Sequence, residues 1–159
     1  CVEAMAAAPA MARMAIEAAQ RGESALLAER LQSTGTLTIE DVAQASRTGD
    51  VAANAIIQRA GSLVGQMLAS IVNFFNPSHV FIAGRVTDMG PLFLASVRQS
   101  VYHRSLALST RHLEIQYAPL ADDAGVVGAG VLAMQESLSR AGSISGSGSA
   151  AGVGVGAVR

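Results

Sequence analysis

The stretch Asn73-Phe74-Phe75-Asn76-Pro77-Ser78-His79-Val80-Phe81-Ile82-Ala83-Gly84 decides the fold class. A long apolar run with helical periodicity leads into it. Pro77 cannot continue a helix, and it biases Asn76 away from helical backbone. The β-prone run 80–82 then ends at Gly84, where the backbone can turn and approach a ligand. The order of helix, stop, buried strand and glycine turn predicts one unit of an α/β domain.

Composition limits the classes of protein to which the chain can belong. The 159 residues suffice for one domain with a core, and half of them are hydrophobic. The net charge of −1 gives no electrostatic footprint for nucleic acid or an acidic membrane surface. The most apolar stretch, Leu63 to Phe75, is interrupted by Gln66 and Asn73 and is shorter than a membrane span. We therefore expect no membrane partner.

Cys1 is the only cysteine, and it is also the first residue. A single thiol excludes a disulfide framework and is typical of a reducing compartment, so we expect a cytoplasmic protein. The first residues do not have the pattern of a secretory signal. Because the chain begins with Cys-Val-Glu rather than with Met, we also expect it to be a fragment of a longer polypeptide.

Capping signals and apolar periodicity predict mostly helix on both sides of the quoted stretch. Thr38 and Asp41 form a capping-box-like start, and Asp50 caps a helix over residues 51–75 that carries two adjacent apolar rows. An alternating run at 113–117 predicts a second, half-buried strand. The other helices are expected at residues 2–21 with a break at Pro9, 24–31, 38–48, 91–104 and 124–138.

Two strands are too few for an independent sheet. Either they join a sheet whose other members precede Cys1, or the chain is a helical domain with a small β element. The helices carry more apolar surface than two strands can cover, so we expect a partner surface. That surface would be a missing half of the protein or another subunit in a dimer or tetramer. Residues 141–159 are rich in Gly and Ser, which predicts a flexible tail.

Four landmarks then resemble one protein family. Cys1-Val2-Glu3-Ala4 resembles the end of the signature CxCGxxGCxE of the ROK family, the bacterial sugar kinases and sugar-responsive repressors. Gly49-Asp50 before a long helix resembles that family's GD step. Residues 73–84 look like its N-x-x-N-P-x-x-hydrophobic-G-G segment, and residues 123–130 are similar to its C-terminal agliGAa helix. The landmarks follow the family's order.

The resemblance implies an α/β fold of two actin-like (ribonuclease H-like) ATPase domains, with sugar bound in the cleft between them. Residues 1–140 would be the helix-rich C-terminal lobe of this sugar-binding fold, with few strands. The lobe would lack the phosphate-binding loop and the catalytic aspartate, so it could not complete a phosphoryl transfer alone. A protein of the repressor branch would also have a winged helix-turn-helix at its N-terminus, which this chain lacks.

The resemblance also implies two site residues at the start of the chain. Cys1 would be the last thiolate of a structural zinc site in the longer parent protein, although a tetrahedral site needs four ligands and none of the three histidines lies at ligand spacing. Within this chain the alternative is an inert terminal thiol. Glu3 would accept hydrogen bonds from sugar hydroxyls. Its alternative is an acid that interacts with the dipole at a helix start.

Gly84 would lie where the nucleotide approaches in the kinases, at a position that tolerates no side chain. The alternative is a plain turn residue after a strand. The family often has a second glycine next, whereas this chain has Arg85. A side chain at that position could obstruct the phosphates of a nucleotide or hold them, and the departure counts against a working kinase.

Other polar residues have plainer explanations, and we assign no catalytic residue. Asp122 and Asp123 could suggest a metal or acid–base site, but acids in front of a helix are explained as caps. His103 and His112 are expected at the surface or its boundary. No G-x-S-x-G motif points to a serine nucleophile.

Two functions follow from the resemblance. The first is a sugar-responsive transcriptional regulator, in which a sugar or sugar phosphate shifts a dimer between DNA-competent and DNA-incompetent states. The second is an ATP-dependent hexose kinase, which would use ATP and Mg²⁺. We favour the regulator because Arg85 replaces the second glycine and residues 102–111 look more like the repressor branch. DNA would bind only through the missing N-terminal domain. A non-catalytic helical interaction module is a third alternative.

Overall fold

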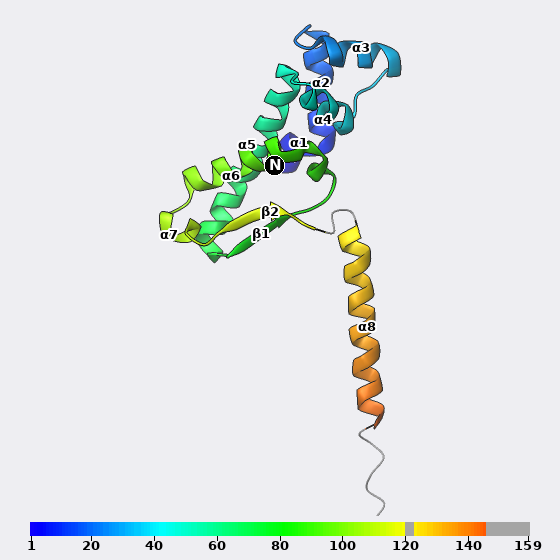
Figure 1. The fold of residues 1–159 in the computed structure, drawn as a ribbon, viewed down its shortest axis with the longest axis vertical. Helices are drawn as coiled ribbons and strands as arrows, with labels where there is room; N and C mark the ends of the chain where they lie inside the picture. The colour runs from blue at the N-terminus through cyan, green and yellow to red at the C-terminus, as the bar shows by residue number, and fades with distance from the viewer. Residues whose placement is uncertain (120–122, 146–159) are drawn as a thin grey trace, which may run out of the picture. The chain divides into compact units, whose positions relative to one another are not determined.

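A computed structural model describes residues 1–119 and 123–145 and contains two compact units, residues 1–122 and 123–159. Figure 1 shows their elements. The elements of the first unit are α1 (Val2–Ala6), α2 (Ala8–Gln20), α3 (Ala25–Thr34), α4 (Ile39–Arg47), α5 (Val51–Phe75), β1 (His79–Ile82), the 3-10 helix η1 (Arg85–Met89), α6 (Gly90–Arg104), α7 (Ala107–Thr110) and β2 (Glu114–Tyr117). The second unit contributes α8 (Ala124–Ser145).

Helix starts lie where the capping residues predict them. Pro9 lies in the first turn of α2, which follows the short helix α1 as the sequence predicts. The capping box of α4 is complete, because Thr38 and Asp41 each accept a hydrogen bond from the other's backbone N–H. The side chain of Asp50 accepts a bond of 2.9 Å from the N–H of Ala53 at the start of α5. These caps satisfy backbone donors that a helix start leaves without partners.

The chain departs from the sequence prediction where helices end. Helix α5 ends at Phe75 as expected, but Asn76 adopts left-handed backbone (φ 49°, ψ 52°) rather than the extended conformation that Pro77 favours. Asparagine tolerates this conformation, and the N–H of Asn76 closes the helix on Val72 O. Helix α8 continues to Ser145, past the predicted start of the flexible tail at Ala141. The rest of the predicted tail lies outside the described residues.

The two predicted strands pair with each other in parallel. The register joins His79 to Glu114, Val80 to Ile115, Phe81 to Gln116 and Ile82 to Tyr117. On one face of the pair Ile82 and Ile115 are buried, whereas on the other face Phe81 is about half exposed (54%). The described part of the first unit is thus a helix-rich α/β arrangement with one two-stranded sheet.

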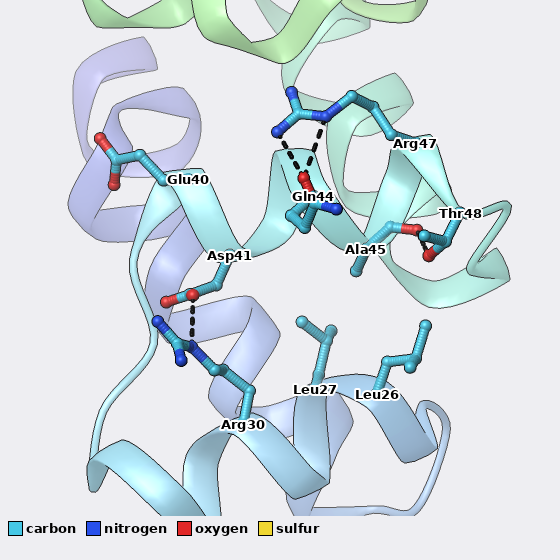
Figure 2. Close-up of a pocket in the computed structure, with 9 residues that line it drawn as sticks. All are labelled: Leu26, Leu27, Arg30, Glu40, Asp41, Gln44, Ala45, Arg47 and Thr48. Atoms are coloured by element: carbon cyan, nitrogen blue, oxygen red, sulfur yellow. Dashed lines mark hydrogen bonds and ion pairs between the residues drawn. The ribbon is translucent and has the colours of Figure 1, made fainter.

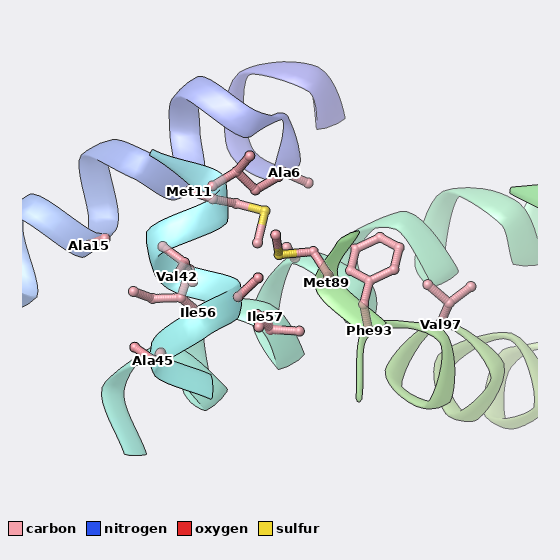
Figure 3. Packing of buried hydrophobic residues seen from close by; sticks show 14 of the residues in the cluster. Ala6, Met11, Ala15, Val42, Ala45, Ile56, Ile57, Met89, Phe93 and Val97 are labelled. Atoms are coloured by element: carbon pink, nitrogen blue, oxygen red, sulfur yellow. The ribbon is translucent and has the colours of Figure 1, made fainter. Parts of the chain in front are cut away.

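Helix α5 forms the centre of the core. It packs against α1, α2, α4 and α6, and its residues Ile57 and Ala60 are completely buried. Figure 3 shows the cluster in which Met11 of α2 and Phe93 of α6 meet residues of α5. No Trp and few aromatic residues take part, so methionine and small aliphatic side chains fill this core as the composition predicts.

Two glycines set the distance between α5 and α6. A Cβ atom built on Gly61 would lie 2.7 Å from Ser96 Cβ and 2.8 Å from Phe93 O. A Cβ atom on Gly65 would lie 2.6 Å from Ser100 Cβ and 2.7 Å from Val97 O. Backbone oxygens cannot move aside as a flexible side chain can. The two helices therefore approach each other at a distance that only glycine permits.

Helix α5 is also the one described helix long and apolar enough to cross a membrane, by length and composition alone. The helix begins at Val51 and is therefore longer than its apolar stretch from Leu63 to Phe75, which alone is too short to span a membrane. Four helices pack on it, however, and Gly61 and Gly65 are closed by α6. This packing is that of a core helix of a folded domain.

We expect Gly61→Ala to destabilise the first unit by about 1–3 kcal/mol, the usual cost of overpacking a dense interface. The change in the free energy of unfolding can be measured by urea denaturation. Gly125→Ala in α8 is the control, because a Cβ at that helical position meets nothing within 4 Å among the described residues of its own unit. There the higher helix propensity of Ala should stabilise by up to about 1 kcal/mol. Equal effects of the two substitutions would contradict the proposed close packing.

Candidate functional site

Cys1 and Glu3 line one hollow at the start of the chain. The hollow has a volume of about 370 Å³ and lies between α1 and the first turns of α2, where Pro9 and Arg13 also border it. Both Glu3 and Arg13 are exposed. Nη2 of Arg13 lies 3.5 Å from Ala4 O, at the limit of a hydrogen bond. The carboxylate of Glu3 is therefore accessible to a ligand with hydroxyl groups, while a cation borders the same hollow.

The thiol of Cys1 is free and exposed. Within residues 1–119 and 123–145, no group of three or more His, Cys, Asp or Glu residues could hold a metal ion. Tetrahedral zinc needs four ligands, so the described residues supply at most two of them. The role of Cys1 as a zinc ligand stays a prediction that depends on residues outside this chain.

Gly84 follows β1 and precedes η1. Its backbone has φ 86° and ψ −173°, a conformation that side chains disfavour. In the part of the chain that the structure describes, a Cβ atom at Gly84 would meet nothing within 4 Å. Backbone conformation rather than crowding within the described residues therefore favours glycine here. The carbonyl of Gly84 is fixed by two bonds of 2.9 Å from the N–H and hydroxyl of Thr87.

Arg85, which occupies the position of the family's second glycine, makes an ion pair with Glu40 of α4. This hydrogen bond from Arg85 is the main reason why the pKa of Glu40 lies below its usual value. The pair ties the turn after β1 to the first turn of α4, and η1 as a whole packs against that helix. The guanidinium of Arg85 thus has a carboxylate partner forty-five positions away in sequence.

A second hollow of about 600 Å³ lies between α3 and α4 (Figure 2). Two of its charged side chains bind each other, since Arg30 Nε lies 2.8 Å from Asp41 Oδ1. Arg47 donates two hydrogen bonds to Gln44 Oε1, of 2.8 and 3.2 Å. The sequence does not predict this hollow, because it forms only where two separate helices meet.

Asp41 is the best-connected carboxylate of that hollow. Burial would raise the pKa of Asp41, but the backbone N–H of Thr38, the Arg30 side chain and the Thr38 hydroxyl outweigh it and lower the pKa. The N–H of Thr38 lies 2.9 Å from Oδ2. These bonds explain Asp41 as part of a helix cap and an ion pair between α3 and α4.

His103, His112 and Gly84 line neither of these hollows. His103 and His112 are exposed, as expected. Asp123 is exposed at the start of the second unit, and Asp122 lies outside the described residues, so the predicted cap of α8 stays a prediction. Gly84 does not line the hollow that Cys1 and Glu3 share. The structure therefore places Cys1 and Glu3 at one hollow, and Gly84 outside it.

Comparison with known proteins identifies the family. The ROK family model matches residues 1–136, and the chain belongs to the ROK family. Its fold is that of the helix-rich part of ROK sugar kinase-like structures, as the sequence predicts. In the crystal structure of a ROK family glucokinase from Streptomyces griseus with glucose and AMPPNP, the similarity covers 85% of this chain and 45% of that one. The TM-score is 0.75, at 29% identity.

The relatives include both kinases and repressors. A glucokinase of Halalkalibacterium halodurans is 30% identical over 136 residues, 86% of this chain and 41% of the relative. A putative xylose repressor of a Caldicellulosiruptor species is 36% identical over 100 residues, 63% of this chain and 24% of the relative. The chain thus spans less than half the length of these relatives.

The lowered pKa of Asp41 predicts how stability depends on pH. Because the folded-state pKa is lower than the unfolded one, the contribution is complete above about pH 5 and is lost as pH falls through the folded-state pKa. Asp41→Asn should cost about 1 kcal/mol at pH 7, the typical value of a helix cap, and almost nothing near pH 2. Urea denaturation at both pH values measures this, with Asp88→Asn at an exposed position as the control. A cost that persists near pH 2 would contradict the assignment.

Proposed function

We propose that the chain is the effector-binding C-terminal region of a sugar-responsive transcriptional regulator of the ROK family. The observation that carries this choice is Arg85, which replaces a glycine beside Gly84 and is paired with Glu40. A kinase needs a backbone approach for the nucleotide phosphates at this turn, whereas a regulator that only binds a sugar does not. The 36% identity to the putative xylose repressor supports the same choice.

The alternative is an ATP-dependent hexose kinase, which would use ATP and Mg²⁺. The similarity to the Halalkalibacterium halodurans glucokinase extends over more of the chain than that to the putative xylose repressor. The structural likeness to a glucokinase that holds AMPPNP also favours it. Phosphoryl transfer would still need the groups that position and neutralise the phosphates, which the sequence analysis does not find in this chain.

Glu3 is the residue through which we propose that the sugar or sugar phosphate binds. Carboxylates form strong, bidentate hydrogen bonds with neighbouring hydroxyls. The exposed carboxylate and the hollow that it lines are compatible with this role. Zinc, if the parent protein binds it, would include Cys1 among its ligands. This zinc site would then hold the first turn of α1 in place.

Association with another surface is a further part of the proposal. Large apolar side chains are exposed at the end of α5 and in α7, with Phe74 81% and Leu108 84% exposed. Another part of the parent protein, or another subunit in a dimer or tetramer, would cover them. DNA would bind through an N-terminal domain, and a cytoplasmic location fits the single free thiol.

A direct test separates the two functions. The complete reading frame that contains these residues is expressed, its segment before Cys1 is read, and sugar-dependent ATP hydrolysis is measured in a coupled assay. We expect a helix-turn-helix in the segment before Cys1 and no sugar-dependent ATP hydrolysis. A phosphate-binding loop with robust turnover would establish the kinase instead.

Glu3→Gln in that complete protein should weaken sugar binding by about 10- to 100-fold. The loss of a charge-assisted hydrogen bond costs about 1.5–3 kcal/mol, which gives this range. Isothermal titration calorimetry measures the dissociation constant. Glu29→Gln, at an exposed position of α3, should leave the constant unchanged. Unchanged affinity in the Glu3 variant would exclude this residue from the sugar site, whichever branch the protein belongs to.

The 159-residue chain by itself should self-associate or aggregate, because its exposed apolar surface lacks a cover. Light scattering across a dilution series should give a mass above that of the monomer. A monomer that stays soluble at high concentration would show that the exposed side chains at Phe74 and Leu108 need no partner.

A further inference from the structure

One end of the first unit lies away from the carboxyl ends of the strands, where ligands of open α/β sheets bind. The last turns of α5 and α6 and the short helix α7 meet at this end, beside the starts of both strands (Figure 1). Asn73 joins them: its Nδ2 donates to Arg104 O at 3.2 Å, and its Oδ1 accepts from the N–H of Leu106 at 3.0 Å. We call residues 73–75 and 103–112 the α7 end.

Large apolar side chains stand out from the α7 end. Phe74 is 81% and Leu108 84% exposed, and Phe75 and Leu106 are exposed to a similar degree. The rings of Phe74 and Phe75 meet edge to face, with their centroids 4.8 Å apart. Because the bonds of Asn73 fix the backbone beneath these side chains, a partner would bind a surface that is already ordered.

The α7 end is also basic, although the whole chain has a net charge of −1. From Met89 to Leu113 the sequence contains no aspartate or glutamate. Arg104 and Arg111 are exposed, and among the described residues neither guanidinium forms an ion pair. Glu114, the next acid along the chain, lies beside His79, with 3.7 Å between Oε2 and Nε2. The net charge therefore does not represent the local charge of this surface.

Charge disfavours two possible occupants of the α7 end. In a symmetric dimer the same patch lies on both sides of the contact, so Arg104 and Arg111 would face a surface of the same sign. An anionic membrane is recognised by clusters of about four to eight Lys or Arg residues, whereas this end presents two arginines.

A protein surface with carboxylates around apolar side chains fits the α7 end better. The cores of protein interfaces are enriched in aromatic residues and Arg and depleted in Lys, and this end has the same composition. An arginine binds a carboxylate through two parallel hydrogen bonds. The apolar contacts would then come from Phe74 and Leu108, and the charged contacts from Arg104 and Arg111.

We infer that the α7 end is the docking surface for an acidic amphipathic helix of another protein. Such a helix binds an exposed apolar surface through one face, and its flanking carboxylates reach the cations beside that surface. The inference rests on the association proposed above and gives the chemistry of the partner. It does not depend on whether the protein is a regulator or a kinase.

The probe for this inference is a synthetic helical peptide with leucines on one face and glutamates on the other, labelled with fluorescein. A second peptide has lysine in place of each glutamate and the same leucines. Fluorescence anisotropy measures the binding of both to the complete reading frame at low and at high ionic strength. We expect the glutamate peptide to bind at least about 10-fold more tightly than the lysine peptide, and high salt to reduce this preference.

Two variants of the complete protein locate the binding surface. Arg104→Gln with Arg111→Gln should weaken the glutamate peptide about 5- to 30-fold, the range for the loss of two exposed ion pairs. Arg47→Gln with Arg59→Gln, at two exposed arginines outside the α7 end, is the matched control and should leave its affinity unchanged. Because all four side chains are exposed, both variants should keep the urea unfolding midpoint of the parent.

The apolar half of the surface has its own variant. Phe74→Ser with Leu108→Ser should weaken both peptides, because each presents the same leucines. Val51→Ser is the control, since Val51 is 81% exposed at the opposite end of α5.

Equal affinity for the two peptides would overturn the inference, and so would a glutamate peptide that binds the arginine variant as well as the parent. If the complete protein does not bind the glutamate peptide, its own polypeptide or a second copy covers the α7 end, and the inference is wrong. Binding to vesicles of phosphatidylcholine and phosphatidylglycerol, without binding of the glutamate peptide, would assign the surface to a membrane instead. Calorimetry with the sugar tests the proposed function separately, so the failure of one proposal is not the failure of the other.

Discussion

The close approach of α5 and α6 is the constraint on which the first unit depends. Because Gly61 and Gly65 have no side chains, α6 lies so close to α5 that a Cβ atom at either glycine would collide with it. Ser100 Oγ then reaches Ser62 O at 3.0 Å and joins the two helices by a polar bond as well. Strand β1 follows α5 directly, and strand β2 follows α6 after the short helix α7, so the distance between α5 and α6 also affects how the two strands meet. A wider separation would separate the sheet from the core.

Local signals made much of this arrangement predictable. Pro9, Thr38 and Asp50 act on backbone groups within a few positions, so sequence alone locates the helices that they start. Helix η1, helix α7 and the left-handed Asn76 were not predicted. The start of α7 depends on a contact from afar, because Asn73 Oδ1 accepts a hydrogen bond of 3.0 Å from the N–H of Leu106, thirty-three positions away. Capping rules concern residues that are close in sequence, so they do not predict this long-range hydrogen bond.

In the candidate site, too, local features could be predicted from the sequence and long-range contacts could not. Cys1 and Glu3 share a hollow because they are neighbours in sequence, which the motif already implied. The hollow between α3 and α4 could not be predicted, since Arg30 meets Asp41 only after two helices pack. The pairing of Arg85 with Glu40 could not be predicted either. The sequence predicts a side chain that obstructs or holds phosphates, whereas in the structure Arg85 pairs with Glu40.

The place of Gly84 at the end of a strand bears on how it would act. In open α/β sheets, ligands bind outside the carboxyl ends of the strands, at the point where the strand order reverses. Gly84 follows the carboxyl end of β1 directly. The ion pair between Arg85 and Glu40 holds the turn that contains Gly84 against α4, so a ligand at this strand end would approach a backbone that is fixed from the side.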